Sequence, residues 1–269
     1  MSRSIAKALT GLVRALSAPM GRYGRLKTRL MVAENLVQVI DVGGMKFYSP
    51  TARSTHDTNA VLDDAEPETI RWLDTLPEGD VLWDIGANVG AFTMYAAVRR
   101  GLRVVAFEPG AASFAVLTRN IELNGLAGRA DAYCVALADD TRLDYLHMAN
   151  TGPGHSMHAF GTNDTVDGPI SPVFRQAVPG FTADRFQEMF NAPKPQHIKL
   201  DVDSIELAVL HGAEHLLRDS VQSLLVEVDG HEDGAEIRRF LNTLGFDEEK
   251  PAAGGAIRNA LFRKAQTSR

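Results

Sequence analysis

Apolar positions beyond residue 62 recur in two alternating patterns, short continuous runs and stripes at helical spacing. Runs typical of buried strands occupy residues 81–87, 103–109, 131–138, 197–203 and 223–230. Stripes predict helices at about 66–76 and 90–100, and around the apolar groups Phe114-Leu117-Ile121, Ile205-Val209-Ala213-Leu216 and Ile237-Phe240-Leu241-Leu244. Residues 245–249 and 259–264 can supply a closing pair of strands.

This order of strands and helices predicts an α/β fold. Strands that alternate with helices over such a length form a mostly parallel sheet with helices on both faces. The five runs and the closing pair make seven strands. Ligands of such sheets bind beyond the carboxyl ends of the strands, so the residues that end each strand are the first candidates for a functional site.

Residues 1–62 have a different pattern and are expected to form an extension to a domain that spans residues 63–269. Ile5, Leu9, Leu12, Val13 and Leu16 recur at helical spacing. A hairpin is expected further on, from two short strands around Gly43-Gly44.

Charge is unevenly divided between these two parts. Residues 1–30 carry seven basic side chains and no acidic one, which leaves a net charge of −13 on the remainder of the chain. The acidic remainder argues against nucleic acid as a partner, because phosphate binding needs a basic face. The basic amphipathic helix has three interpretations: packing on the domain or on a partner subunit, binding to an anionic membrane surface, or targeting.

The remaining composition is that of a globular protein. No run of 18 apolar residues is present, so no membrane span is expected. The single cysteine, Cys134, excludes an intramolecular disulfide framework, which favours the reducing cytoplasm. It lies in an apolar run and is expected to be buried. Residues 147–180 are rich in glycine, proline and histidine and are expected to form a long irregular loop that faces the substrate.

The first strand runs into a glycine loop, Asp84-Ile-Gly86-Ala-Asn88-Val-Gly90. The dinucleotide-binding fingerprint is G-x-G-x-x-G, and its middle glycine lets the backbone approach a pyrophosphate. Asn88 occupies that place, so the loop favours a nucleoside ligand without a phosphate against it. S-adenosylmethionine is such a ligand, and Asp84 could accept a hydrogen bond from its ammonium group.

The second and third strands end in residues that suit the same nucleoside. Glu108 ends the second strand, where a carboxylate can accept both ribose hydroxyls, and Ala136 and Leu137 could flank the adenine. We therefore expect cofactor contacts from Asp84, Gly86, Ala87, Asn88, Gly90, Thr93, Glu108, Pro109, Ala136 and Leu137.

The chain resembles the FkbM family of methyltransferases over roughly residues 64–230. The segments DIGANVG, FEP, RNIELNG, VAL, GFTADRF, IKLDVDSIELAVLHGA and LLVEV occur in the order and spacing of that family. The resemblance implies a Rossmann-like class I methyltransferase that uses S-adenosylmethionine, typically to methylate hydroxyls of sugars or secondary metabolites. It also implies that the KLDVD strand end belongs to the reaction centre. Asp203-Ser204 replaces the usual Glu-Gly, and Thr182-Ala183-Asp184 replaces Thr-Leu-Asp.

Methyl transfer to a hydroxyl requires a group that accepts the proton of the acceptor. The candidates are Asp201, Asp203, Glu227 and the loop histidines His155, His158 and His231. Lys199 is expected to pair with Asp201, either as a pair alone or as a pair that also orients the substrate. Asp203 with Glu206, and Asp233 with Glu236, also fit capping boxes. A divalent metal held by Asp201, Asp203 and Glu227 is an alternative that no compact ligand motif favours.

These observations predict an S-adenosylmethionine-dependent O-methyltransferase that acts on a small molecule or glycan, as a monomer or a homo-oligomer. Its catalytic candidates are Lys199, Asp201, Asp203, Glu227 and His155. An N-methyltransferase, a nicotinamide-dependent oxidoreductase and a cofactor-binding module without catalysis are the alternatives.

Overall fold

The fold is described from a computed structural model. It describes residues 11–21, 23–26, 28, 38–50, 66–165, 168–203, 205–228, 232–249 and 259–265. The predictions for the first ten residues, for Ser204 and for His231 lie outside these ranges.

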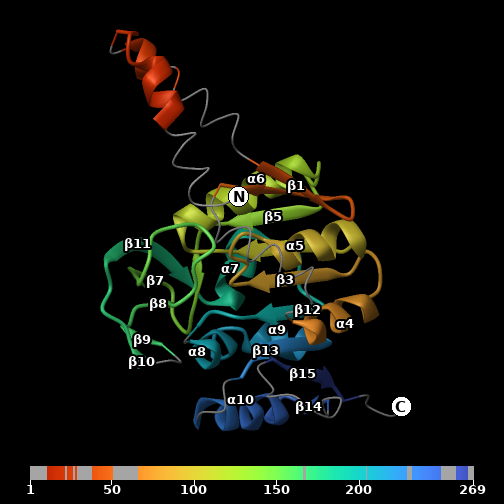
Figure 1. The fold of residues 1–269 in the computed structure, drawn as a ribbon. Helices are drawn as coiled ribbons and strands as arrows, with labels where there is room; N and C mark the ends of the chain where they lie inside the picture. The colour runs from red at the N-terminus through yellow and green to blue at the C-terminus, as the bar shows by residue number, and fades with distance from the viewer. Residues whose placement is uncertain are drawn as a thin grey trace.

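A seven-stranded sheet forms the centre of the molecule (Figure 1). Its strand order is β14-β15-β13-β12-β3-β4-β5, and β15 alone runs antiparallel to its neighbours within this sheet. The predicted seven-stranded, mostly parallel sheet is therefore confirmed. The strands are β3 (Val81–Ile85), β4 (Arg103–Phe107), β5 (Ala130–Tyr133), β12 (His197–Leu200), β13 (Ser223–Glu227), β14 (Phe246–Glu248) and β15 (Asn259–Lys264).

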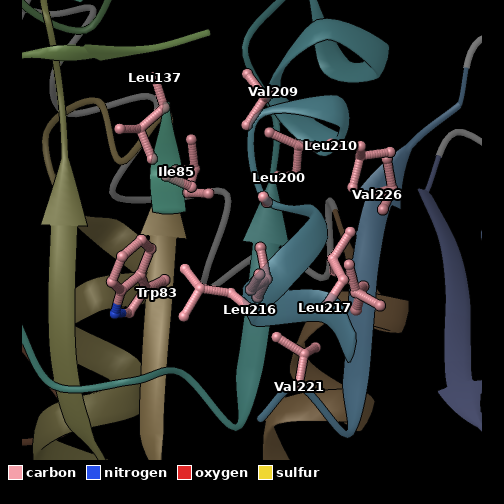
Figure 2. Close-up of a cluster of buried hydrophobic side chains, with 14 of the residues drawn as sticks. Trp83, Ile85, Leu137, Leu200, Val209, Leu210, Leu216, Leu217, Val221 and Val226 are labelled. Carbon is pink, nitrogen blue, oxygen red and sulfur yellow. The ribbon is translucent and has the colours of Figure 1, made fainter. Parts of the chain in front are cut away.

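Successive residues of each strand enter hydrophobic clusters on opposite faces of the sheet. Trp83 faces the cluster formed with α7 (Ala183–Phe190), α8 (Glu206–His211), α9 (Glu214–Asp219) and α10 (Glu232–Thr243). Figure 2 shows part of this cluster, in which α8 and α9 bring Val209, Leu210, Leu216 and Leu217 over the sheet. Leu82 faces the other cluster, with α4 (Pro67–Thr75), α5 (Ala91–Met94), the π-helical turn η1 (Tyr95–Arg99) and α6 (Ala111–Leu123).

The helix expected from the apolar stripe at 205–216 is wrong, because the chain divides it into α8 and α9. A Cβ atom on Gly212 would lie 2.1 Å from the carbonyl oxygen of Ala138, so the chain turns at this close contact. The Asp184 carboxylate accepts the backbone N–H groups of His215 and Leu216 at the start of α9.

The capping box predicted at Asp203 and Glu206 does not form. Ile205, not Asp203, is the N-cap residue of α8, and Oδ2 of Asp203 accepts the N–H of Met157. Glu206 does bond back to the chain, at the N–H of Val202. Asp233, the first residue of the other predicted box, lies within α10, which begins at Glu232.

A second sheet corrects two predictions. It has the order β6-β11-β7-β8 and contains β6 (Ala136–Leu137), β7 (Arg142–Met148), β8 (His158–Phe160) and β11 (Phe174–Phe181). The strand predicted at 131–138 therefore divides, with β5 in the central sheet and β6 in the second. Residues 147–180, expected to be irregular, supply β8, β11 and the small pair β9 (Asp164–Thr165) and β10 (Gly168–Pro169). Cys134, expected to be buried, is half-buried at the division between β5 and β6.

The predicted hairpin is confirmed as β1 (Gln38–Val42) and β2 (Met45–Ser49). Phe47 is fully buried in the cluster that Leu82 faces. Residues 11–17 are helical, and Figure 1 shows this red segment away from the two sheets. None of the helices in the described ranges has both the length and the apolar character needed to span a membrane.

Candidate active site

A cavity of about 320 Å³ lies at the carboxyl ends of β3, β4, β12 and β13. It brings together all five predicted catalytic residues and most of the predicted cofactor residues, which are Lys199, Asp201, Asp203, Glu227, His155, Asp84, Gly86, Ala87, Asn88, Glu108, Pro109, Ala136 and Leu137. Gly90 and Thr93 do not line it. The second sheet also lines the cavity, through Leu146 in β7 and through His158 and Phe160 in β8.

The glycine loop is shaped by contacts with its neighbours. Gly86 has φ +84°, and a Cβ atom there would lie 1.7 Å from the carbonyl oxygen of Asp201. Gly90 has the same φ, and its Cβ would lie 2.5 Å from Cδ1 of Leu117 in α6. Packing therefore requires glycine at Gly86, where β3 meets the backbone that follows β12, whereas Gly90 contacts a side chain of α6 outside the cavity lining.

Asp84 is buried, with 1% of its surface exposed. Thr93 donates its hydroxyl to Oδ2, whereas Oδ1 has no hydrogen-bond partner among the described residues. Burial raises the pKa of this carboxyl, and the nearby Lys199 ammonium opposes that rise. Thr93 is therefore a support for Asp84, and Oδ1 is an acceptor that suits a cationic donor from a ligand.

Glu108 is held in one orientation from both sides. Its Oε2 accepts the N–H of Asn88 at 2.9 Å, and its Oε1 accepts the N–H of Gly110 at 2.7 Å. Burial raises its pKa from 4.5 to about 7 despite these two bonds. Each carboxylate oxygen has a second lone pair, so Glu108 fits the two hydroxyls of a ribose.

A row of polar side chains crosses the sheet on the face that carries α4 and α5. Lys199 in β12 lies in register with Asp84 in β3, and Glu227 in β13 lies in register with Asn259 in β15. All four side chains line the cavity. The row extends the site from β3, which lies beside β4 and its Glu108, toward the edge of the sheet formed by β14.

Lys199 and Asp201 form the predicted pair, with 2.7 Å between Nζ and Oδ2. The ammonium also lies 5.0 Å from the centre of the Phe92 ring. Burial disfavours the charged form of Lys199, but the carboxylates of Asp201, Glu66 and Asp84 outweigh it and raise the pKa of the amine. Lys199 is buried, whereas the Asp201 side chain is 30% exposed and presents its carboxylate at the cavity.

Glu66, Asn259 and Phe92 also line the cavity and were not predicted from the sequence. The Asn259 amide donates to Glu66 at 3.2 Å and to Glu68 at 3.3 Å, which joins the start of α4 to the start of β15. Because β15 runs antiparallel to β13, its first residue lies at the edge of the sheet where the parallel strands end. Asn259 could therefore be assigned to the site only once the direction of β15 was known.

Two of the three predicted loop histidines, His155 and His158, line the cavity, and His231 lies outside the described residues. Nδ1 of His158 is buried without a hydrogen-bond partner among the described residues, and burial lowers the pKa of this imidazole.

Within the described ranges, no group of three or more His, Cys, Asp or Glu side chains could hold a metal ion. The positions of Asp201, Asp203 and Glu227 therefore give no support to a joint metal site.

The order and directions of the strands in the central sheet give a Rossmann-like fold of the class I methyltransferase type. The family model "Methyltransferase FkbM domain" matches residues 84–248, more than half of the chain. The chain belongs to the FkbM family of methyltransferases.

The individual relatives have low sequence identity to this chain or match only a short segment of it. Hexuronic acid methyltransferase AglP of Haloferax volcanii is 28% identical over 179 residues, which cover 66% of this chain and 68% of that protein. The 31-O-demethyl-FK506 methyltransferase FkbM of Streptomyces tacrolimicus is 42% identical over 62 residues, 23% of this chain and 24% of that protein. A crystal structure of methyltransferase FkbM from Methylobacillus flagellatus has 16% identity and a TM-score of 0.46, and covers 88% of this chain and 59% of that chain.

Proposed function

We propose that this protein transfers a methyl group from S-adenosylmethionine to a hydroxyl of a sugar, glycan or secondary metabolite. The observation that carries the proposal is the Lys199–Asp201 pair, which opens on the cavity beside Asp84. The names of the relatives support an oxygen acceptor, since one states a 31-O-demethyl compound and the other a hexuronic acid.

The residues of the nucleoside half fit the cofactor. Oδ1 of Asp84 would accept from the ammonium group, Glu108 from the ribose hydroxyls, and Ala136 and Leu137 would contact the adenine. The Asn88 N–H is already bonded to Glu108, so Asn88 positions that carboxylate. When bound, S-adenosylmethionine supplies an electrophilic methyl group.

The other half of the cavity would hold the acceptor. Asp201, Glu227, Glu66 and Asn259 offer oxygen acceptors and an amide, which suit a compound with several hydroxyls. As the bond between the acceptor oxygen and the methyl carbon forms, that oxygen becomes acidic, and Asp201 accepts its proton. A carboxylate paired with Lys199 is a weak base, which suffices because the proton leaves only as positive charge develops on oxygen. Lys199 orients Asp201 through their 2.7 Å ion pair.

The test is methyl transfer to a library of monosaccharides, glycosides and polyols, read by mass spectrometry. We expect an O-methylated product, and Asp201→Asn should lower kcat by about 100-fold or more while the affinity for S-adenosylhomocysteine stays within about threefold. Asp139→Asn is the matched control, because Asp139 is also ion-paired, at 3.1 Å from Arg142, but lies outside the cavity lining. Transfer to nitrogen alone, or full activity in Asp201→Asn, would contradict the proposal.

A further inference from the structure

Residues 149–157, here called the strap, connect β7 to β8 and bring His155 and Ser156 to the cavity. Two hydrogen bonds attach the strap to different parts of the fold. The N–H of Gly154 donates to the hydroxyl of Ser113 in α6 at 3.1 Å, and the N–H of Met157 donates to Oδ2 of Asp203 at 2.7 Å. The strap is therefore tied to α6 and to the segment that follows β12.

Both partners of the second bond have left-handed backbone conformations. Met157 has φ +66° and Asp203 has φ +69°. Non-glycine residues rarely adopt such angles, and they persist only where surrounding contacts hold them. A methionine and an aspartate that bond to each other in this conformation at the edge of a cavity indicate a contact that the fold maintains against local backbone preference.

The position of Asp203 places this contact over the nucleoside half of the cavity. The other attachment of the strap, Ser113, lies in the first turn of α6, the helix that follows β4 and Glu108, the carboxylate suited to the ribose. In agreement with this position, the negative charge of Asp203 is among the smaller causes that raise the pKa of Glu108. Asp203 therefore belongs to the cofactor side of the cavity, and its Oδ2 is engaged by the strap.

We propose that Asp203 is a positioning residue, which latches the strap over the bound cofactor and slows its release. The inference rests on the proposed function in that the ligand is S-adenosylmethionine or its product. It assigns proton acceptance to Asp201 and removes it from Asp203. The latch is a charge-assisted hydrogen bond from a backbone N–H, so its strength depends on an acceptor oxygen at this position.

Three substitutions separate the acceptor oxygen from the backbone angle. Asp203→Asn keeps an acceptor oxygen and tolerates the left-handed angle, whereas Asp203→Ala loses both properties. Asp203→Gly loses the acceptor but adopts the angle without strain. Asp140→Ala is the matched control, because Asp140 accepts the N–H of Thr141 at the same 2.7 Å but lies on the surface outside the cavity lining.

The measurements are the dissociation rate of S-adenosylhomocysteine by stopped-flow competition and the rate of proteinase K cleavage within residues 149–157. We expect Asp203→Ala and Asp203→Gly to raise both rates by about tenfold or more, and Asp203→Asn and Asp140→Ala to stay within about threefold of the unsubstituted chain. Ser113→Ala, which removes the other attachment, should also accelerate cleavage.

Two results would overturn the latch. The first is an Asp203→Gly variant with unchanged dissociation and cleavage rates. The second is an Asp203→Asn variant that loses turnover by about 100-fold with both rates unchanged, which would identify Asp203 as a proton acceptor. Cleavage of the ligand-free protein tests the latch even if S-adenosylhomocysteine does not bind, so failure of the proposed function is a distinct outcome.

Discussion

At the scale of single residues, Gly86 has the closest approach to another backbone atom among the glycines that the structure describes. Its left-handed angle excludes most other residues, and so does the Asp201 carbonyl oxygen, which would lie 1.7 Å from a Cβ atom. Gly79 has φ +86° but open space around it, so it isolates the cost of the angle. We expect Gly79→Ala to lower the free energy of unfolding by about 1–2 kcal/mol. Gly86→Ala should cost more and abolish S-adenosylhomocysteine binding, as measured by urea unfolding and calorimetry. Equal losses in the two variants would contradict this prediction.

Glu108 should make both stability and cofactor affinity depend on pH. The folded, ligand-free protein holds its proton up to about pH 7, whereas the unfolded chain loses it near pH 4.5. Between pH 4.5 and about 7 the folded state therefore binds more protons than the unfolded chain. The contribution of Glu108 to the free energy of unfolding falls as pH rises through this range. Ribose hydroxyls donate to the ionised carboxylate, so affinity should fall by about tenfold for each pH unit below 7.

Calorimetry of S-adenosylhomocysteine binding between pH 5.5 and about 8 measures this dependence. Glu108→Gln should bind weakly and with little change across the range. Glu206→Gln is the control, because burial also raises the pKa of Glu206 to about 7, but its carboxyl bonds to Val202 and does not line the cavity. If the Glu206→Gln variant loses the dependence and the Glu108→Gln variant keeps it, the assignment to Glu108 is wrong.

The residues that end parallel strands were predictable, because each follows or ends an apolar run and because the carboxyl ends of parallel strands lie at one edge of the sheet. Asp84, Glu108 and the Lys199–Asp201 pair belong to this group. Asn259 and Glu66 were not predictable, since they meet only through the antiparallel direction of β15. Asp203 was placed in a capping box on spacing alone, but its backbone angle and its bond to Met157 take it out of the helix.

At the scale of elements, buried strands were predicted well and divisions within elements were not. An apolar run records burial, and burial determines that a strand forms. The division between β5 and β6, and that between α8 and α9, arise from contacts distant in sequence, such as Gly212 against Ala138. The second sheet was missed because its glycines and prolines are typical of loops, and its pairing of β11 with β6 and β7 is nonlocal.

At the scale of the whole molecule, the amino-terminal residues divide into a part outside the core and a part within it. Leu12 and Leu16 are 54% and 65% exposed, so these side chains do not pack on the domain. Exposed apolar residues in a segment with seven basic and no acidic side chains leave a partner subunit, an anionic membrane surface or a targeting role as the proposed interpretations. The buried hydrophobic side chains of the described core begin at Val42.

Two truncations test this division. Removal of residues 1–30 should leave the free energy of unfolding and S-adenosylhomocysteine affinity unchanged, and should abolish flotation with anionic vesicles or a concentration-dependent dimer, whichever the full chain shows. Removal of residues 1–62 also deletes Val42, Met45 and Phe47 from the core. That loss should cost more than about 3–5 kcal/mol, the range for truncating one buried phenylalanine. If the second truncation is as stable as the full chain, residue 62 is a domain boundary, and the hairpin is an accessory to a domain that folds without it.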